Sequence, residues 1–98
     1  MSPKLPVTAV DEQGKPLIEY PVAYPFKVMG KQEGFREYVH QLFARLLGRA
    51  LAPEAVEELP SNKGTYVSLT VTVHLESEDQ RRGIYEALHR EERIRYYL

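Results

Sequence analysis

The side chains that most often carry chemistry are few in this chain and far apart. Its three histidines, His40, His74 and His89, fall on three different predicted elements, and the 98 residues include no cysteine. Metal sites need clustered nitrogen, sulfur or oxygen ligands, and disulfides and thiol nucleophiles need cysteine. We therefore expect no bound metal and no cofactor.

The carboxylates are no better arranged for catalysis. Glu57 and Glu58 are adjacent, and on a strand their side chains would face opposite sides, so they cannot act as a paired acid and base. The chain has no phosphate-binding loop, dinucleotide fingerprint or nucleophile elbow. We expect that the protein is not an enzyme.

Composition narrows the class of function further. Thirteen Lys and Arg against fourteen Asp and Glu give a formal charge of −1, which argues against a nucleic-acid binder driven by phosphate neutralisation. The first residues lack the apolar region of a signal peptide, and no apolar run approaches 18 residues. We expect a soluble cytoplasmic protein of one domain, with no membrane contact.

Apolar periodicity predicts the elements that would position these side chains. Apolar residues from Phe35 to Leu47 recur every three or four positions, as on one face of a helix. Residues Tyr66–Leu75 alternate apolar and polar, as in a strand with one buried face. A second helix begins at Ser77, which with Gln80 forms a capping box. Weaker patterns predict strands at 24–30, 55–59 and 94–98.

The resulting order, β-α-β-β-α-β, predicts an α+β fold: a ferredoxin-like two-layer sandwich with a four-stranded antiparallel sheet and two helices on one face. The crossover rule places the first and third strands in the centre. Residues 1–22 form an arm or a weak hairpin, and residues 23–98 form the domain. The expected core comprises Phe26, Val28, Leu42, Phe43, Leu46, Val67, Leu69, Val71, Val73, Ile84, Leu88, Ile94, Tyr96 and Leu98.

The face of the sheet opposite the helices is expected to be open. Alternation places on it Lys27, Met29, Tyr66, Ser68, Thr70, Thr72, His74, Arg95 and Tyr97. Such a face is either solvated, covered by residues 1–22, or used for binding and dimerisation. Exposed Arg and Tyr side chains are enriched at protein interfaces, but they are also common cross-strand packing pairs.

Two loops are further candidates for binding. The loop Gly30–Gly34 leads into the first helix, whose free N–H groups could attract a carboxylate; we favour a simpler interpretation, a chain reversal that needs its glycines. The turn Pro60–Gly64 either binds a partner or is a hairpin turn in which Gly64 supplies a positive φ. The candidate binding residues in or beside these loops are Gly30, Gly34, Ser61, Lys63, Gly64, Tyr66 and Ser68.

Four segments resemble the YbeD-like family of small bacterial proteins. They are YPFKVMG at 24–30, PSNKGTYVS at 60–68, IYEAL at 84–88 and IRYYL at 94–98. The resemblance covers residues 22–98 and implies the same β-α-β-β-α-β sandwich, which is similar to ACT regulatory domains. It also implies a regulatory role near lipoate metabolism.

These observations predict a small regulatory or adaptor protein that binds a protein partner, or itself, or a small carboxylate. Two alternatives stay open. One is an RNA-binding module that uses the open face, for which only Tyr66 and Tyr97 could stack on bases. The other is a structural homodimer in which residues 1–22 cover the sheet.

Overall fold

The computed structural model describes residues 18–60 and 64–98. Its elements follow the predicted order: β1 (Val22–Lys31), α1 (Phe35–Leu47), the short 3₁₀ helix η1 (Pro53–Ala55), β2 (Val56–Pro60), β3 (Tyr66–Leu75), α2 (Glu78–Arg90) and β4 (Tyr96–Tyr97). The predicted α+β class and ferredoxin-like arrangement are therefore confirmed. The predicted arm at 1–22 lies mostly outside the described residues; residues 18–21 form no strand.

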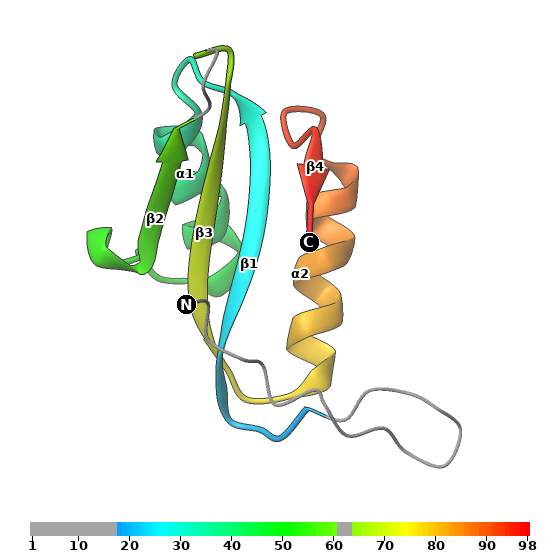
Figure 1. Cartoon of the computed structure of the whole chain (residues 1–98). Coiled ribbons are helices and arrows are strands. Elements are labelled where there is room, and N and C mark those ends of the chain that lie inside the picture. Colours follow the sequence, from blue (N-terminus) through cyan, green and yellow to red (C-terminus); the bar gives the residue numbers. More distant parts are fainter. Residues whose placement is uncertain (1–17, 61–63) are drawn as a thin grey trace.

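The four strands form one antiparallel sheet in the order β2-β3-β1-β4, with β1 and β3 in the centre as predicted. Both helices pack behind the sheet (Figure 1). All ten residues of β1 pair with β3, from Val22 opposite Leu75 to Lys31 opposite Tyr66. The two shorter strands pair with the outer edges of this long central pair, β2 with β3 and β4 with β1.

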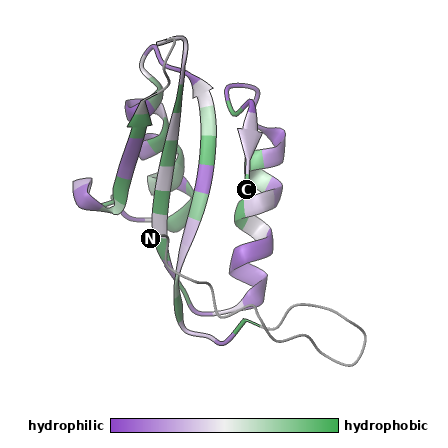
Figure 2. Cartoon of the chain, viewed as in Figure 1, coloured by the Kyte–Doolittle hydropathy of each residue, from purple (hydrophilic) through white to green (hydrophobic). Residues whose placement is uncertain are grey.

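The core lies between the sheet and the helices. Along β3 the burial alternates strictly, with Val67, Leu69, Val71, Val73 and Leu75 buried, and Figure 2 shows the matching alternation in hydropathy. The buried residues that α1 contributes are Phe35, Val39, Leu42 and Phe43, and α2 contributes Ile84, Ala87 and Leu88. Burial of these apolar surfaces is the main driving force for folding.

Three residues predicted to lie in the core are exposed, namely Leu46, Tyr96 and Leu98. Leu46 is in the last turn of α1, where it lines a surface hollow together with Gln80 and Gly83 of α2 instead of packing on the sheet. Tyr96 and Leu98 lie on the side of the sheet away from the helices, opposite to the predicted side. Six buried residues outside the predicted core complete it: Tyr24, Phe35, Val39, Val56, Leu75 and Ala87.

The ends of the helices follow their predicted signals. The Ser77 hydroxyl accepts a hydrogen bond from the backbone N–H of Gln80 (3.3 Å), which is half of the predicted capping box. The Gln80 side chain accepts from the N–H of Glu76 (2.6 Å) and not from that of Ser77. Within the described ranges, neither helix has the length and apolar content that crossing a bilayer requires.

Candidate functional site

The open face is the side of the sheet turned away from both helices. Strand alternation and the pairing register place on it the side chains of Ala23, Pro25, Lys27, Met29, Lys31, Glu57, Leu59, Tyr66, Ser68, Thr70, Thr72, His74, Tyr96 and Leu98. It is the one broad surface of the sheet that neither helix covers (Figure 1). We take it as the candidate functional site.

The register orders these side chains into rows that cross the strands. In one row Leu59, Ser68, Met29 and Tyr96 lie side by side, from β2 through β3 and β1 to β4. In the next row lie Glu57, Thr70 and Lys27. Leu98 completes this row, because its backbone exchanges two hydrogen bonds with Lys27 (3.1 and 2.8 Å).

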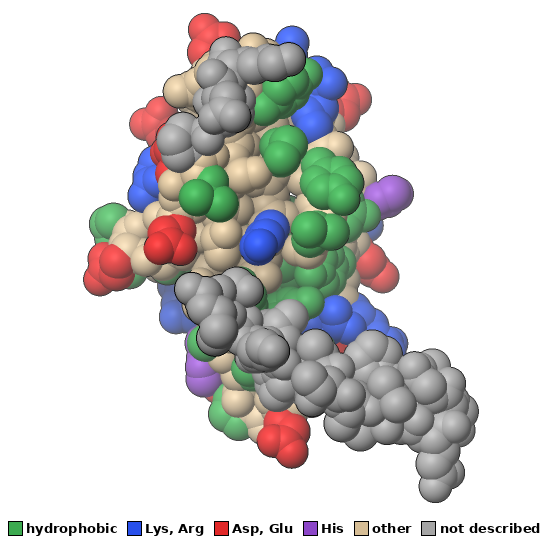
Figure 3. All heavy atoms as spheres, in the orientation of Figure 1, with side chains coloured by type: hydrophobic (Ala, Val, Ile, Leu, Met, Phe, Trp, Pro, Cys, Tyr) green, Lys and Arg blue, Asp and Glu red, His purple; other side chains and the backbone are tan. Residues whose placement is uncertain are grey.

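Large hydrophobic side chains are unusually exposed on this face. Leu59 is 62% exposed, and Tyr96 and Leu98 are each 57% exposed. Figure 3, which views the open face, shows hydrophobic side chains gathered over β1 and β4 beside a basic side chain, with an acidic one over β2. A contiguous apolar group with charges beside it is typical of a surface that binds another molecule.

The predicted orientation of the last two tyrosines is wrong. Tyr97 pairs with Val28, faces the core side and lies against Tyr85 (ring centroids 6.0 Å apart), while Tyr96 pairs with Met29 on the open face. The prediction extended one alternating strand back to Ile94. In the structure Ile94 belongs to a turn, since its N–H donates to the carbonyl of Glu91 (3.1 Å), so the alternation starts afresh after it.

The other predicted site residues lie on the open face, beside it, in the two loops, or outside the described residues. Lys27, Met29, Tyr66 and Ser68 lie on the open face, as expected. Gly30 and Gly34 bound the loop before α1, and Arg95 is exposed beside β1, where its N–H donates to the carbonyl of Met29 (2.8 Å). Gly64 has the predicted positive φ of 71°. Ser61 and Lys63 lie outside the described residues.

The sequence prediction of the open face lacked seven of its residues: Ala23, Pro25, Lys31, Glu57, Leu59, Tyr96 and Leu98. On β2 the apolar Leu59 and the charged Glu57 face the same side. The strand therefore lacks the alternation of polar and apolar residues that would reveal its faces. For Glu57 and Leu59 the sequence signal is Val56, the buried residue of this strand, because counting outward from Val56 gives their observed faces.

The loop from Gly30 to Gly34 is held by packing contacts. An added Cβ at Gly30 would lie 2.4 Å from the ring of Phe35 and 2.6 Å from the carbonyl oxygen of Arg93. The Arg93 guanidinium donates to the carbonyl of Glu33 (2.7 Å) and lies over the ring of Tyr38 (4.6 Å). A shallow hollow of about 430 Å³ follows this loop at the first turn of α1. A carboxylate in this place stays a prediction.

The three histidines lie apart in the structure too. His74 contacts Glu76 (2.8 Å) at the end of β3, His89 contacts the Tyr97 hydroxyl (3.0 Å), and His40 lines the hollow at the start of α1. In residues 18–60 and 64–98, no group of three His, Asp or Glu side chains is placed to hold a metal ion.

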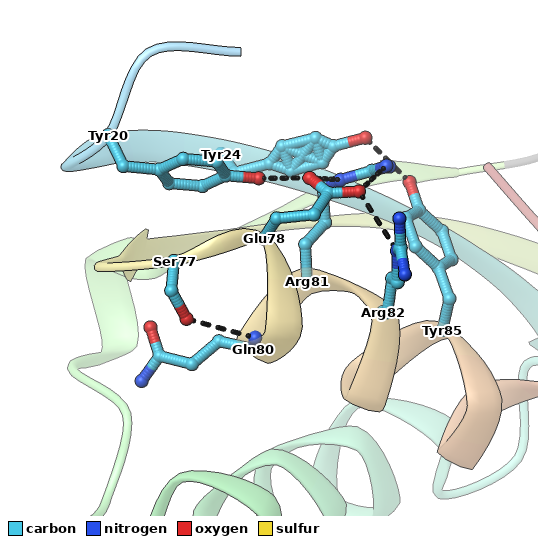
Figure 4. A network of polar contacts seen from close by, with 8 residues as sticks. All are labelled: Tyr20, Tyr24, Ser77, Glu78, Gln80, Arg81, Arg82 and Tyr85. Atoms are coloured by element: carbon cyan, nitrogen blue, oxygen red, sulfur yellow. Dashed lines mark hydrogen bonds and ion pairs between the residues drawn. The ribbon is translucent and has the colours of Figure 1, made fainter. Parts of the chain in front are cut away.

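The most perturbed titratable groups belong to a polar network on the helix side. Glu78 accepts two hydrogen bonds from Arg81 (3.0 and 2.7 Å), one from Tyr20 (2.7 Å) and one from Arg82 (3.3 Å), as Figure 4 shows. Hydrogen bonding to Arg81 is the main reason why the pKa of Glu78 falls to about 2. The same contact raises the pKa of Arg81.

This network fixes the start of β1 to α2. The Arg81 guanidinium lies near the rings of Tyr24 (5.7 Å) and Tyr85 (5.6 Å), whose hydroxyls are 2.9 Å apart. Burial, and then the hydrogen bond with Tyr24, raise the pKa of Tyr85. At the other helix end, burial and the contact with Glu91 raise the pKa of Tyr38. These groups stabilise the fold and lie away from the open face.

The Glu78 network predicts how stability responds to acid. The pKa of this carboxyl is about 2 in the folded chain against 4.5 for the free group, so its contribution is complete above about pH 4.5 and is lost as the pH falls towards 2. Glu78→Gln should lower the melting temperature at pH 7 and flatten its fall between pH 5 and 2. Thermal melts followed by circular dichroism over this range measure both effects.

Glu86→Gln is the matched control, because Glu86 is an exposed carboxyl in the same helix. Its melting temperature should fall between pH 5 and 2 as steeply as that of the wild type. Equal slopes for the Glu78→Gln variant and the wild type would contradict the role of this network.

Comparisons with known proteins place the chain among bacterial relatives. Residues 15–98 match a family model described as "Protein of unknown function (DUF493)". A UPF0250 protein of Leptothrix cholodnii is 45% identical over 73 residues, which cover 74% of this chain and 79% of the relative. One of Bordetella parapertussis is 42% identical (74% and 80% covered), and one of Nitrosomonas europaea 38% (74% and 84%). No solved structure matches significantly.

Proposed function

Because the chain belongs to the DUF493 family, whose UPF0250 relatives are the YbeD-like proteins that the sequence resembles, we propose that it is a regulatory or adaptor protein that acts by binding, without catalysis. Its binding surface is the open face, and the molecule it binds there is a protein. The proposal concerns this face as a whole and not a pocket.

One observation carries the proposal. Leu59, Tyr96 and Leu98 are each more than half exposed on the single sheet surface that neither helix covers. Exposing large apolar side chains to water costs free energy, and aromatic and Met side chains are enriched where proteins bind each other. Lys27 and Glu57 lie among them and can fix the orientation of a partner through charge.

The composition of the face favours protein over RNA. RNA-binding sheets of this topology stack bases on aromatic rings of their central strands, but the central positions here are Lys27, Met29, Ser68 and Thr70. Tyr97, one of the two predicted stacking residues, faces the core side. A formal charge of −1 provides little attraction for phosphates.

A small carboxylate effector remains a prediction that rests on the free N–H groups at the start of the first helix, and the link to lipoate metabolism is a prediction that rests on the resemblance alone. The hollow at the start of α1, lined by Arg36 and His40 among others, is the place where such a ligand would bind. Thermal shifts of the full chain with lipoate, octanoate and amino acids test it. A ligand that raises the melting temperature supports an effector, and a flat panel removes it.

Site-specific photo-crosslinking in the source cells tests the proposed function. A benzoylphenylalanine in place of Tyr96 should give covalent adducts with protein, and the same group in place of Gln41, an exposed residue of α1, should not. The adducts should disappear when Leu98→Asp is added, since Leu98 lies in the row next to Tyr96. Adducts that nuclease removes, or equal adducts from both positions, would contradict the proposal.

A further inference from the structure

The open face has a charge pattern that is complementary to itself. Across β3, Glu57 on β2 and Lys27 on β1 lie on the two sides of Thr70 in one row. Two strand spacings, about 9.6 Å, separate their Cα atoms. Among the described residues neither side chain takes part in an ion pair.

The apolar side chains repeat this arrangement. In the neighbouring row Leu59 on β2 and Met29 on β1 lie on the two sides of Ser68. In these two rows the small polar side chains of β3 therefore lie in the middle, and each flank carries one apolar group and one charge. The charges on the two flanks are opposite in sign.

A two-fold axis parallel to β3 makes these flanks meet. Rotation about such an axis, placed above the open face, keeps every row in place and lays β2 of one copy over β1 of the other. Glu57 then faces Lys27 of the second copy, Leu59 faces its Met29, and each contact occurs twice, as in any isologous interface. Packed sheets cross at about 30°, which moves partners this close to the axis by only about 2–3 Å.

From this geometry we infer that the open face binds the open face of a second copy of the chain, so that the protein forms a two-fold symmetric dimer. This inference rests on the proposed function and names its partner. In these two rows the charges and the apolar groups are both in self-complementary positions, which favours a second copy of the chain as the partner.

The available area predicts a weak dimer. The axis above β3 lays only β1, β2 and β3 of the two copies over one another, so β4 lies outside the overlap. The ten residues of β3 span about 33 Å, and three strands span about 10–14 Å, so the overlap offers roughly 300–500 Å² per copy. Standard interfaces bury about 800 Å² per partner. The dimer should therefore dissociate on dilution, which suits a regulatory protein that exchanges partners.

A charge swap tests the dimer in the full-length chain. Sedimentation equilibrium at low salt should show a dimer that dissociates with decreasing concentration. Lys27→Glu alone and Glu57→Lys alone each put two pairs of like charges in contact, and each should raise the dissociation constant at least about tenfold. The double variant Lys27→Glu/Glu57→Lys restores both pairs and should return the constant to within about threefold of the wild type.

The matched control is Glu58→Lys. This variant makes the same change of charge as Glu57→Lys, one position further along β2. Because Glu58 faces the helix side, where it contacts Arg36 (3.4 Å), dimerisation should be unaffected. Circular dichroism checks that every variant is folded. A double variant as weak as the single ones, an equal loss in Glu58→Lys, or a monomer at millimolar concentration would overturn the inference. If the chain is monomeric but still gives protein adducts from position 96, the dimer is wrong and the proposed function stands. If it neither dimerises nor gives protein adducts, both the dimer and the proposed function are wrong.

Discussion

Phe26→Ala should lower the free energy of unfolding by about 3–5 kcal/mol, the range typical of a fully buried phenylalanine. Phe26 is completely buried in the middle of β1. Its ring contacts those of Tyr24 (centroids 4.8 Å apart), Tyr85 (5.0 Å) and Phe43 (5.9 Å), which come from β1, α2 and α1. Its loss leaves a cavity at the point where the sheet and both helices meet. Urea unfolding followed by circular dichroism measures the change.

Met29→Ala is the matched control for this prediction. Met29 lies three residues further along the same strand, on the open face, so its replacement should change the free energy of unfolding by less than about 0.5 kcal/mol. Similar losses in the two variants would mean that the open face is buried in the monomer, and the proposed binding surface would be lost with it.

Gly30→Ala should destabilise the fold by about 1–3 kcal/mol, as overpacking of a tight site does. The added methyl group would lie 2.4 Å from the Phe35 ring and 2.6 Å from the backbone carbonyl of Arg93. The carbonyl cannot rotate away as a side chain would, so β1, the start of α1 or the turn before β4 must shift. Urea unfolding again provides the measurement.

Gly83→Ala provides a control of opposite sign. Gly83 lies inside α2, and a Cβ there would have no neighbour within 4 Å. Alanine is the better helix former, so this variant should gain about 0.5–1 kcal/mol. If Gly30→Ala were also stabilising, the close approach of Arg93 to β1 would be wrong.

Much of the fold could be predicted because its strongest sequence patterns are local. The alternation from Tyr66 to Leu75 gave β3 with its observed bounds, and the apolar stripe from Phe35 to Leu47 gave α1. In both cases one buried face repeats with the period of the element, so no knowledge of distant residues is needed. The order of the strands then followed from the crossover rule.

The parts that failed depend on contacts between distant segments. Tyr96 and Tyr97 lie on the faces opposite to those predicted, because Ile94 belongs to a turn and the strand begins only after it. The two residues of β4 are also too few to show a period. The hydrogen bond of Tyr20 with Glu78 joins positions 58 residues apart. No local pattern signals such a pair.

The candidate site was predicted in part for the same reason. Lys27, Met29, Tyr66 and Ser68 lie on the two long central strands, whose alternation is clear, and they were assigned to the open face correctly. The exposed apolar residues that carry the proposed function, Leu59, Tyr96 and Leu98, lie on or beside the short outer strands. The faces of Tyr96 and Leu98 depend on the register with β1, which only the fold provides.

Covalent footprinting with hydroxyl radicals tests most directly whether the open face is a protein-binding surface. The labelling of four exposed hydrophobic side chains is compared between the purified chain at high dilution and the same chain in nuclease-treated extract of its source cells. Three of them, Leu59, Tyr96 and Leu98, lie on the open face, and Leu46 on α1 is the internal control. These three side chains should be protected in the extract, and Leu46 should be labelled equally in both samples. Equal labelling of the three in both samples, or protection of Leu46 alone, would contradict it.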